Sequence, residues 1–392
     1  MAEDTASLNR AARQAMSAGN FAGAQALLLR ALQRDKTSIP TWLNLAATRR
    51  QLGDTGGTYG ALREVLRLEP RHFHALLMIA TLQEREGKIK PAAASYGIAL
   101  ANAPPDQYLD PPTLQAVAHA RDIHARHTCE LDEFIRAHVG DAQRQCTPAE
   151  RRRIDAFIGH TLRTRQRCSQ EPSDYFYPGL PAIEFYEREE FPWLSDLEAA
   201  TGAIQQELAT ILLEDQAEFA PYIHYDDHLP LDQWRELNHS PRWSAFHFYE
   251  KGKPVEARCR RAPVTMQVLA TLPQAHVQLR SPSALFSVLQ PKTRIPPHTG
   301  VANFRLVVHL PLILPPGCGF RVGGETRQWR MGEAWVFDDT IEHEAWNDSD
   351  ETRIIFICDI WSPRLSEEER ATIAAVIAST DSFNGTAPAA QI

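Results

Sequence analysis

Three apolar runs in the C-terminal half of the chain predict buried β-strands. The runs span residues 304–310, 334–337 and 353–360. They are rich in β-branched and aromatic residues, a composition that favours strands over helices. Proline and glycine, as at Pro296-Pro297 and Gly323-Gly324, fill the segments around the runs and are typical of turns. The stretch from Ser287 to Trp361 is therefore predicted to be an antiparallel sheet that folds back on itself.

An internal repeat organises the first 105 residues. Gly19, Gly53 and Gly87 recur at intervals of 34 residues, the period of a tetratricopeptide repeat. Small and apolar residues recur with the same period, at Ala31, Val65 and Ala99 and at Leu32, Leu66 and Leu100. Small residues at fixed positions let paired helices approach closely, and stacked pairs bury a continuous core. Residues 1–105 are therefore predicted to form about three helix-turn-helix units with a concave face.

The segment between the repeats and the predicted strands is expected to be helical. Residues 103–112 are proline-rich and predict a break, after which apolar residues return at helical spacing up to Arg167. Thr147, Pro148 and Glu150 have the order of an N-cap, a first-turn proline and a capping-box acid. At Tyr175 the composition becomes aromatic and proline-rich. We therefore expect repeats over 1–105, a helical bridge over 106–174, a β-domain over 175–365, and a C-terminal helix and tail over 366–392.

Shorter patterns predict the remaining elements of the β-domain. Residues 194–213 have the apolar spacing of one amphipathic helix that covers the sheet. Residues 243–249 alternate in the manner of an edge strand, and 264–272 predict a second covering helix. An amphipathic helix is expected over 366–378 and a frayed tail from Thr380 onwards.

Composition restricts the class of protein. The chain has 392 residues, a length that allows two or three domains. Its formal net charge of −8 gives no electrostatic reason to expect a nucleic-acid partner. The N-terminal residues lack the apolar core of a secretory signal, and no apolar run is long enough to span a membrane. The six cysteines form no CxxC pair, as expected of reduced thiols. These features predict a cytoplasmic protein.

Two histidines and an arginine flank the predicted strands. His298 precedes the first apolar run, His343 follows the second, and Arg353 begins the third. Two imidazoles so placed can meet at one end of a β-fold, and a guanidinium can bind a carboxylate through two hydrogen bonds. The set therefore favours a non-haem iron site with an acidic cosubstrate.

The motifs around these residues resemble the aspartyl/asparaginyl β-hydroxylase family of iron(II)- and 2-oxoglutarate-dependent oxygenases. The matching residues are His298-Thr299-Gly300, Asn303, Arg305-Leu306, His309-Leu310, Val322-Gly323-Gly324-Glu325, Phe337-Asp338-Asp339, Glu342-His343-Glu344, Trp346-Asn347, Arg353, Asp359 and Trp361. The resemblance implies a double-stranded β-helix, or jelly roll, for the β-domain. The expected fold class is thus multidomain α + β, with an all-α tetratricopeptide solenoid followed by the jelly-roll oxygenase domain.

The resemblance also implies roles for individual residues. His298 and His343 would bind Fe(II). Arg353 and Ser287 would hold the distal carboxylate of 2-oxoglutarate, the cosubstrate beside O2. His309 and Arg305 would complete the cosubstrate site.

Two positions depart from wider patterns. Most such oxygenases have an iron-binding carboxylate two residues after the first histidine, where this chain has Gly300, and members of this family also lack it. Val307 stands where the animal protein hydroxylases of the family have a further arginine. That difference weakens the expectation of an aspartyl substrate.

Other readings of the acidic and histidine residues remain open. His224-Tyr225-Asp226 has the order of an ordinary oxygenase ligand pair, but it lies in a polar segment that is better interpreted as a substrate-facing loop. Four acidic residues near His343 could orient the histidines or form a solvated turn; they are Asp338, Asp339, Glu342 and Glu344.

The sequence therefore predicts a dioxygenase that hydroxylates an Asp- or Asn-type side chain of a protein or peptide docked by the repeats. The alternatives are a small-molecule or lipid-linked acyl substrate, or a catalytically inactive binding scaffold. A zinc hydrolase is disfavoured because the chain has no HExxH motif. The repeats could instead only shield the oxygenase or pair two copies of the chain.

Overall fold

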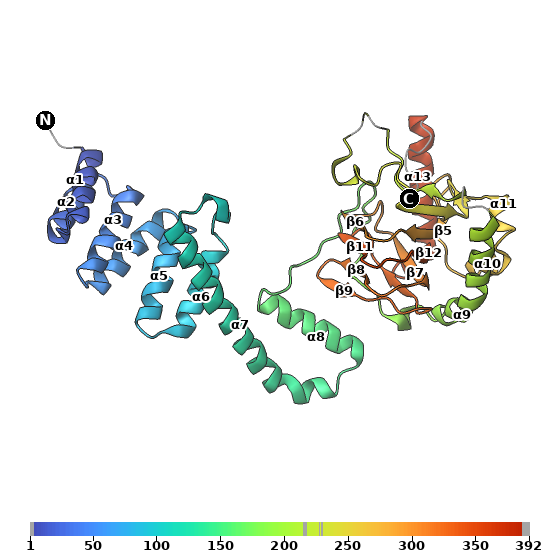
Figure 1. Cartoon of the computed structure of the whole chain (residues 1–392), viewed down its shortest axis with the longest axis horizontal. Helices are drawn as coiled ribbons and strands as arrows, with labels where there is room; N and C mark the ends of the chain where they lie inside the picture. The colour runs from blue at the N-terminus through green and yellow to red at the C-terminus, as the bar shows by residue number, and fades with distance from the viewer. Residues whose placement is uncertain (1–3, 215–217, 227, 229, 386–392) are drawn as a thin grey trace. The chain divides into compact units, whose positions relative to one another are not determined.

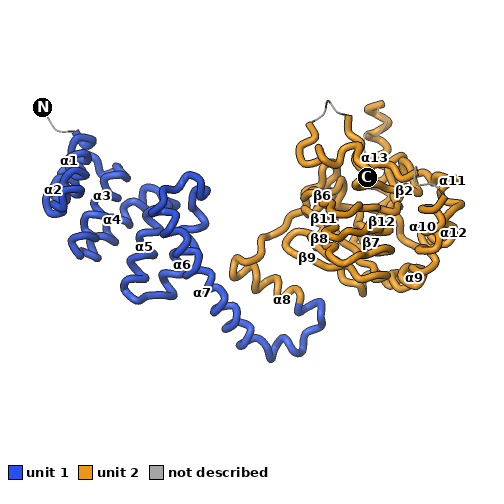
Figure 2. Tube along the Cα trace, viewed as in Figure 1, with its two compact units in different colours: residues 1–151 blue, residues 152–392 orange. Residues whose placement is uncertain are grey.

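The computed structural model describes residues 4–214, 218–226, 228 and 230–385. It consists of two compact units, Met1–Arg151 and Arg152–Ile392, which Figure 2 distinguishes by colour. The first unit is helical and the second contains the strands (Figure 1). No helix in the described part of the chain combines the length and apolar character needed to cross a membrane. The expected multidomain α + β organisation is confirmed.

Three helix pairs of similar length form the repeats. The pairs are α1 Thr5–Ser17 with α2 Phe21–Arg34, α3 Ile39–Gln51 with α4 Thr55–Leu68, and α5 Phe73–Arg85 with α6 Ile89–Leu100. Gly19, Gly53 and Gly87 follow the first helix of each pair, with φ between 74° and 77°, where a residue with a side chain would be strained. Asn20 and Asp54 cap the second helices of the first two pairs. The predicted tetratricopeptide units are confirmed.

A long helix closes the array of repeats. The residues of α7 Pro111–Arg144 that face α6 are Val117, Ala120 and Ile123, which are buried with Tyr96. Terminal helices of this kind cover the apolar face that the last repeat would otherwise expose. The helix α7 belongs to the first unit, and the chain enters the second unit at Arg152, within the segment 106–174 expected to be a helical bridge.

The second unit contains two antiparallel sheets. One has the order β1-β2-β5-β12-β7-β10 and the other β6-β11-β8-β9. Their strands are β1 Ala220–Pro221, β2 Trp243–His247, β5 Ala284–Leu289, β6 Thr293–His298, β7 Arg305–Ile313, β8 Cys318–Val322, β9 Glu325–Arg327, β10 Trp335–Phe337, β11 His343–Asn347 and β12 Arg353–Trp361; a separate ribbon pairs β3 Tyr249–Glu250 with β4 Lys253–Pro254. The three predicted runs correspond to β7, β10 and β12.

Each face of the larger sheet has its own core. On β12, Ile354, Phe356 and Ile360 pack beneath the covering helices, whereas Ile355 faces the smaller sheet, as the two-residue period of a strand requires. The covering helices are α9 Leu194–Ala199, α10 Thr201–Glu214, α11 Glu256–Cys259 and α12 Pro263–Leu269. The inward face, between the sheets, contains the candidate site.

Three local predictions were wrong. Residues 194–213 form two helices, because the chain breaks at Ala200. The strand expected at an edge, β2, lies between β1 and β5 and is almost fully buried. The last helix, α13 Glu367–Asn384, continues past its expected end at Ala378, and Asp381 in its last turns pairs with Arg280. The rest of the expected tail, residues 386–392, lies outside the described residues.

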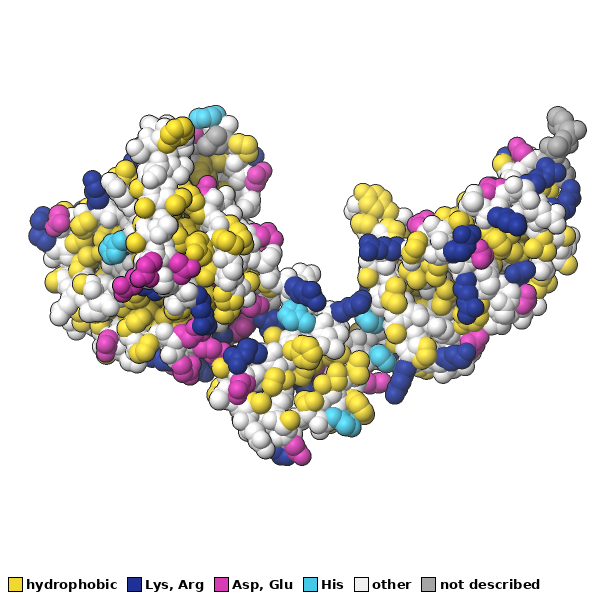
Figure 3. Space-filling view, turned by 180° about the vertical axis from the view of Figure 1, so that it is seen from behind, with side chains coloured by type: hydrophobic (Ala, Val, Ile, Leu, Met, Phe, Trp, Pro, Cys, Tyr) yellow, Lys and Arg dark blue, Asp and Glu magenta, His cyan; other side chains and the backbone are white. Residues whose placement is uncertain are grey.

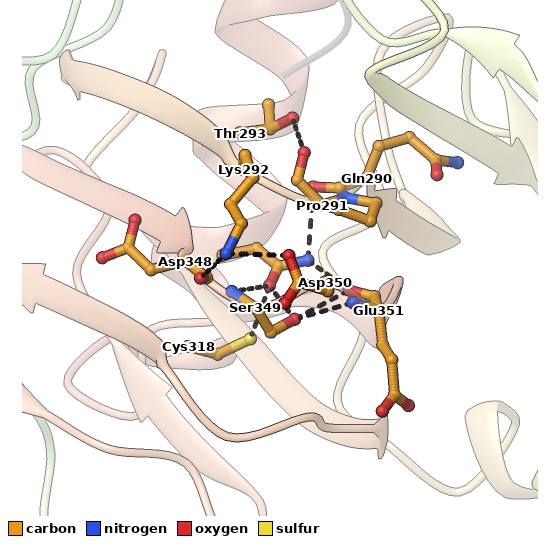
Figure 4. A network of polar contacts seen from close by, with 10 residues as sticks. Gln290, Pro291, Lys292, Thr293, Cys318, Asp348, Ser349, Asp350 and Glu351 are labelled. Carbon is orange, nitrogen blue, oxygen red and sulfur yellow. Dashed lines mark hydrogen bonds and ion pairs between the residues drawn. The ribbon is translucent and has the colours of Figure 1, made fainter.

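One asparagine ties together two turns at the end of the sheets. The side-chain amide of Asn347 donates to the carbonyl oxygens of Leu289, Gln290 and Glu351 at 2.8–3.2 Å. Lys292 adds a hydrogen bond to the Asp348 carbonyl at 2.7 Å (Figure 4). Since β12 begins directly after this network, the network fixes where Arg353 enters the sheet.

Candidate active site

His298 and His343 meet at the end of two paired strands. β6 and β11 are antiparallel, and the two histidines are partners in their register. Their ring centroids are 4.0 Å apart. The expected convergence of the two imidazoles therefore follows directly from strand pairing.

Backbone carbonyls fix the orientation of both rings. Nδ1 of His298 donates to the Pro296 carbonyl at 2.8 Å, and Nδ1 of His343 donates to the Ile341 carbonyl at 3.1 Å. Burial lowers the pKa of His298 to about 3 and that of His343 to about 4. Both rings are thus neutral at neutral pH, with the Nε2 lone pair free, which is the form that binds a metal ion.

The carboxylate of Asp339 fills the space beside Gly300, where a side chain at position 300 would otherwise lie. A Cβ atom on Gly300 would collide with the carboxylate of Asp339. Oδ2 of Asp339 accepts a hydrogen bond from Arg305 at 2.9 Å, while its Oδ1 is buried without a partner among the described residues. No three His, Cys, Asp or Glu side chains form a metal-binding group in the described part of the chain. His298 and His343 are thus a pair of imidazoles rather than part of such a three-residue group.

The other acidic residues near His343 are engaged elsewhere. Asp338 bonds to Thr340 and Gln170, and burial raises its pKa to about 6. Glu342 and Glu344 both pair with Arg321. Of the four acidic candidates, Asp339 is thus the one with an oxygen free beside Gly300.

Arg353 is a buried cation without a carboxylate partner among the described residues. It is 1% exposed, and one terminal nitrogen donates to Oγ of Ser287 at 3.3 Å, while its Nε has no partner. Burial lowers its pKa to about 10, so the guanidinium stays charged at neutral pH. A buried charge is costly unless a counter-ion accompanies it. The site is therefore suited to an anionic ligand.

Ser287 and His309 line the same face of the sheet as Arg353. Oγ of Ser287 also accepts from Nε1 of Trp243 at 3.2 Å, which leaves its hydroxyl proton free to donate. His309 is buried with Nδ1 unpartnered, and burial together with the nearby charge of Arg353 lowers its pKa. The structure thus brings together three predicted cosubstrate residues, whereas it engages Arg305 in the ion pair with Asp339.

Aromatic residues that the sequence did not single out complete the site. The guanidinium of Arg353 lies 5.2 Å from the centre of the Trp329 ring. The rings of Trp234 and Trp243 lie 5.1 Å and 6.3 Å from that of His298. Trp243 begins the predicted strand 243–249, and Trp234 and Trp329 lie outside the predicted elements; no sequence pattern places any of the three rings against His298 or Arg353.

The loop before β2 borders the candidate site through Trp234. His224 contacts His239 through their Nδ1 atoms at 2.7 Å in an exposed segment, and Asp226 is exposed. Trp234, in the same loop, is the residue that reaches His298. The described geometry therefore agrees with a substrate-facing loop.

Sequence comparisons agree with this geometry. The family model described as aspartyl/asparaginyl beta-hydroxylase matches residues 198–363. Aspartate beta-hydroxylase domain-containing protein 2 of Xenopus tropicalis is 30% identical over 272 residues, which cover 67% of this chain and 70% of that protein. The human aspartyl/asparaginyl beta-hydroxylase is 37% identical over 149 residues, 38% of this chain, but the match covers only 19% of its length.

One bacterial relative is named after an acyl group and not after aspartate. The ornithine lipid ester-linked acyl 2-hydroxylase of Rhizobium tropici is 30% identical over 188 residues, which cover 47% of this chain and 62% of that protein.

Proposed function

Because the chain belongs to the aspartyl/asparaginyl β-hydroxylase family, we propose that its second unit is an iron(II)- and 2-oxoglutarate-dependent hydroxylase. The observation that carries the proposal is the buried guanidinium of Arg353, which has no carboxylate partner among the described residues. A dicarboxylic cosubstrate would supply the missing counter-charge.

The cosubstrate would be held by groups on three neighbouring strands. Arg353 would grip the distal carboxylate, and Ser287 would donate its free hydroxyl proton to the same group. His309, which is neutral because its pKa is lowered, has one ring nitrogen available for a hydrogen bond. These three donors suit an anion, since none of them is itself a carboxylate that would repel it.

Iron(II) fits the pair of imidazoles. Nitrogen ligands suit this ion, and the Nδ1 hydrogen bonds of His298 and His343 leave both Nε2 atoms for it. When bound with 2-oxoglutarate and O2, the iron would supply the oxidising chemistry that replaces a C–H hydrogen by a hydroxyl group. Oδ1 of Asp339 is a buried acceptor that could orient water beside this site.

Aromatic side chains would keep water away from the reacting groups. The rings of Phe320 and Phe337 lie 5.1 Å and 4.7 Å from that of His309, and both also approach His343. A dry site strengthens the interactions of charged groups and limits side reactions.

The proposed substrate is an Asp- or Asn-type side chain of a peptide docked by the repeats. The names of the human and Xenopus tropicalis relatives favour this class, and repeat arrays present extended binding surfaces.

A lipid-linked acyl chain is the second candidate. Val307 lies in an apolar cluster with Trp243 and Phe337, and the name of the Rhizobium tropici relative refers to an acyl chain.

The test is release of succinate from 2-oxoglutarate by the purified protein with iron(II), ascorbate and O2. Release that disappears in His298→Ala and in Arg353→Ala would support the proposal. The exposed His276 provides the matched control, His276→Ala, which should retain release. A folded protein that binds neither iron nor 2-oxoglutarate would contradict the proposal and favour an inactive scaffold.

A further inference from the structure

The first helices of the three repeats share one face. Side chains of α1 and α3 meet there, because Nδ2 of Asn9 donates to Oγ1 of Thr41 at 2.6 Å and Nδ2 of Asn44 donates to Oδ1 of Asn9 at 3.3 Å. We call the surface formed by α1, α3 and α5 on this side the inner face. Stacked repeats use such a surface for binding.

Each first helix carries at least one arginine on the inner face. Arg13 lies four residues after Asn9 and therefore on the same side of α1. Counted back from the glycine that ends each helix, Arg13, Arg50 and Arg85 are six, three and two residues away. Arg50 and Arg85 thus stand three and four residues nearer their glycines than Arg13 does, which are the spacings that keep a side chain on the same side of a helix. The charge of Arg85 also acts on Arg50, so the three arginines belong to one side of the array.

These three cations form no ion pair within the described residues. Arg50 is partly buried, and its burial together with the nearby charge of Arg85 lowers its pKa. Some arginines elsewhere in the array are paired, as Arg67 is with Glu64 at 2.9 Å. Like charges held close together without a counter-ion repel each other. The arginines of the inner face therefore lack a carboxylate counter-charge within the described residues.

The charge of the whole array has the same sign. Residues 1–105 contain 13 Lys and Arg but 8 Asp and Glu, whereas the remaining residues contain 28 and 41. Figure 3 shows many Lys and Arg side chains on the surface of the array. A net positive region steers negatively charged partners toward it.

We propose that the inner face binds an acidic segment of a partner polypeptide, whose carboxylates pair with Arg13, Arg50 and Arg85. Bidentate pairing with carboxylates is the interaction for which guanidinium groups are best suited. The inference rests on the proposed function only in that this segment would belong to the hydroxylated protein. Binding itself needs neither iron nor 2-oxoglutarate.

The test uses the full-length protein and a fluorescein-labelled peptide of alternating Glu and Ala. A peptide with Gln in place of Glu is the control ligand. Fluorescence anisotropy should show binding of the Glu peptide that weakens with added salt and exceeds binding of the Gln peptide. The triple variant Arg13→Glu, Arg50→Glu, Arg85→Glu should lower the affinity by at least about tenfold.

A matched variant separates the inner face from general charge effects. Arg63, Arg71 and Lys90 are exposed and lie on the second helices or in a turn, so Arg63→Glu, Arg71→Glu, Lys90→Glu changes the net charge equally and should bind nearly as the wild type. Equal losses in both variants, no loss in the first, or equal binding of the two peptides would overturn the proposal. If the triple variant altered self-association of the protein but not its binding of the Glu peptide, the proposal would also be overturned. The inner face would then bind a second copy of the chain.

Succinate release by the same preparations distinguishes failure of this inference from failure of the proposed function. Both variants should unfold at the same temperature as the wild type. A matching transition would show that the loss of binding comes from the changed charge and not from a loss of folding.

Discussion

Asp359 on β12 lies directly opposite Val307 on β7. Oδ1 of Asp359 accepts from the backbone N–H of Ser283 at 2.8 Å, and Oδ2 is buried without a partner among the described residues. Burial raises the pKa of Asp359 to about 7, against the opposing effect of Arg305. A valine therefore lies beside a buried carboxylate that has one oxygen without a hydrogen-bond partner among the described residues, on the same face of the sheet as Arg353 and His309.

Replacing this carboxylate should change the pH dependence of stability. Between its ordinary pKa of 3.8 and its folded value of about 7, Asp359 holds a proton in the folded protein that the unfolded chain has released. The free energy of unfolding should therefore fall as the pH rises through this range. Asp359→Asn should flatten that fall, measured by urea unfolding at several pH values. Asp350→Asn, at an exposed position, should leave the slope unchanged; the same slope in both variants would refute the assignment.

Val307→Arg should shift substrate preference toward aspartate. Val307 lies in the cluster between the two sheets, so a guanidinium there would offer a cation to the carboxylate of a substrate, whereas the existing Arg305 is already paired with Asp339. Succinate release stimulated by an Asp peptide, relative to the matched Asn peptide, should rise about tenfold, since an added charge pair contributes on the order of 1–2 kcal/mol at a partly buried site. Val307→Met controls for size, and an unchanged ratio in the arginine variant would mean that position 307 does not select the substrate.

Arg353→Ala should raise the concentration of 2-oxoglutarate needed for half-maximal succinate release by at least about tenfold. Without the guanidinium, the distal carboxylate would enter a buried site that has lost its main donor. Stabilisation of the protein by 2-oxoglutarate in thermal unfolding should fall in parallel, which provides a readout independent of turnover. Arg294→Ala removes an exposed arginine instead and should alter neither quantity.

His343→Ala should abolish stoichiometric iron binding, because one of two protein ligands is lost. Metal analysis of the purified protein measures this directly. Retention of one iron per chain in the variant would disprove the ligand assignment.

Gly300→Ala should destabilise the protein by about 1–3 kcal/mol. The new methyl group would collide with Asp339 and disturb its pair with Arg305. Gly202→Ala, at a position with open space around it, should show no such loss. Similar unfolding midpoints for the two variants would indicate that Asp339 moves away at little cost.

Sequence reasoning was most successful where local signals coincide with strand or helix ends. His298, His343 and Arg353 could be placed near one another because each stands at the end of an apolar run, and the 34-residue spacing of glycines located the helix pairs. Both patterns can be recognised in the sequence alone, without knowledge of the tertiary fold.

The remaining features depend on contacts between distant residues. That Asp339 fills the space beside Gly300, or that Trp329 lies against Arg353, follows from how the two sheets close on each other. The position of β2 inside the sheet depends on β1, which is only two residues long. No periodic pattern in the sequence records such packing.

The helix α7 has a consequence for how the protein could evolve. It seals the last repeat with Val117, Ala120 and Ile123, and the boundary between the units follows it at Arg151. The repeats therefore include the helix that covers their last apolar face. Recombination between genes at this boundary would transfer the whole array together with α7 and would expose the core of neither unit. Recombination before α7 would leave an apolar face uncovered, so functional gene fusions should be found at the later boundary.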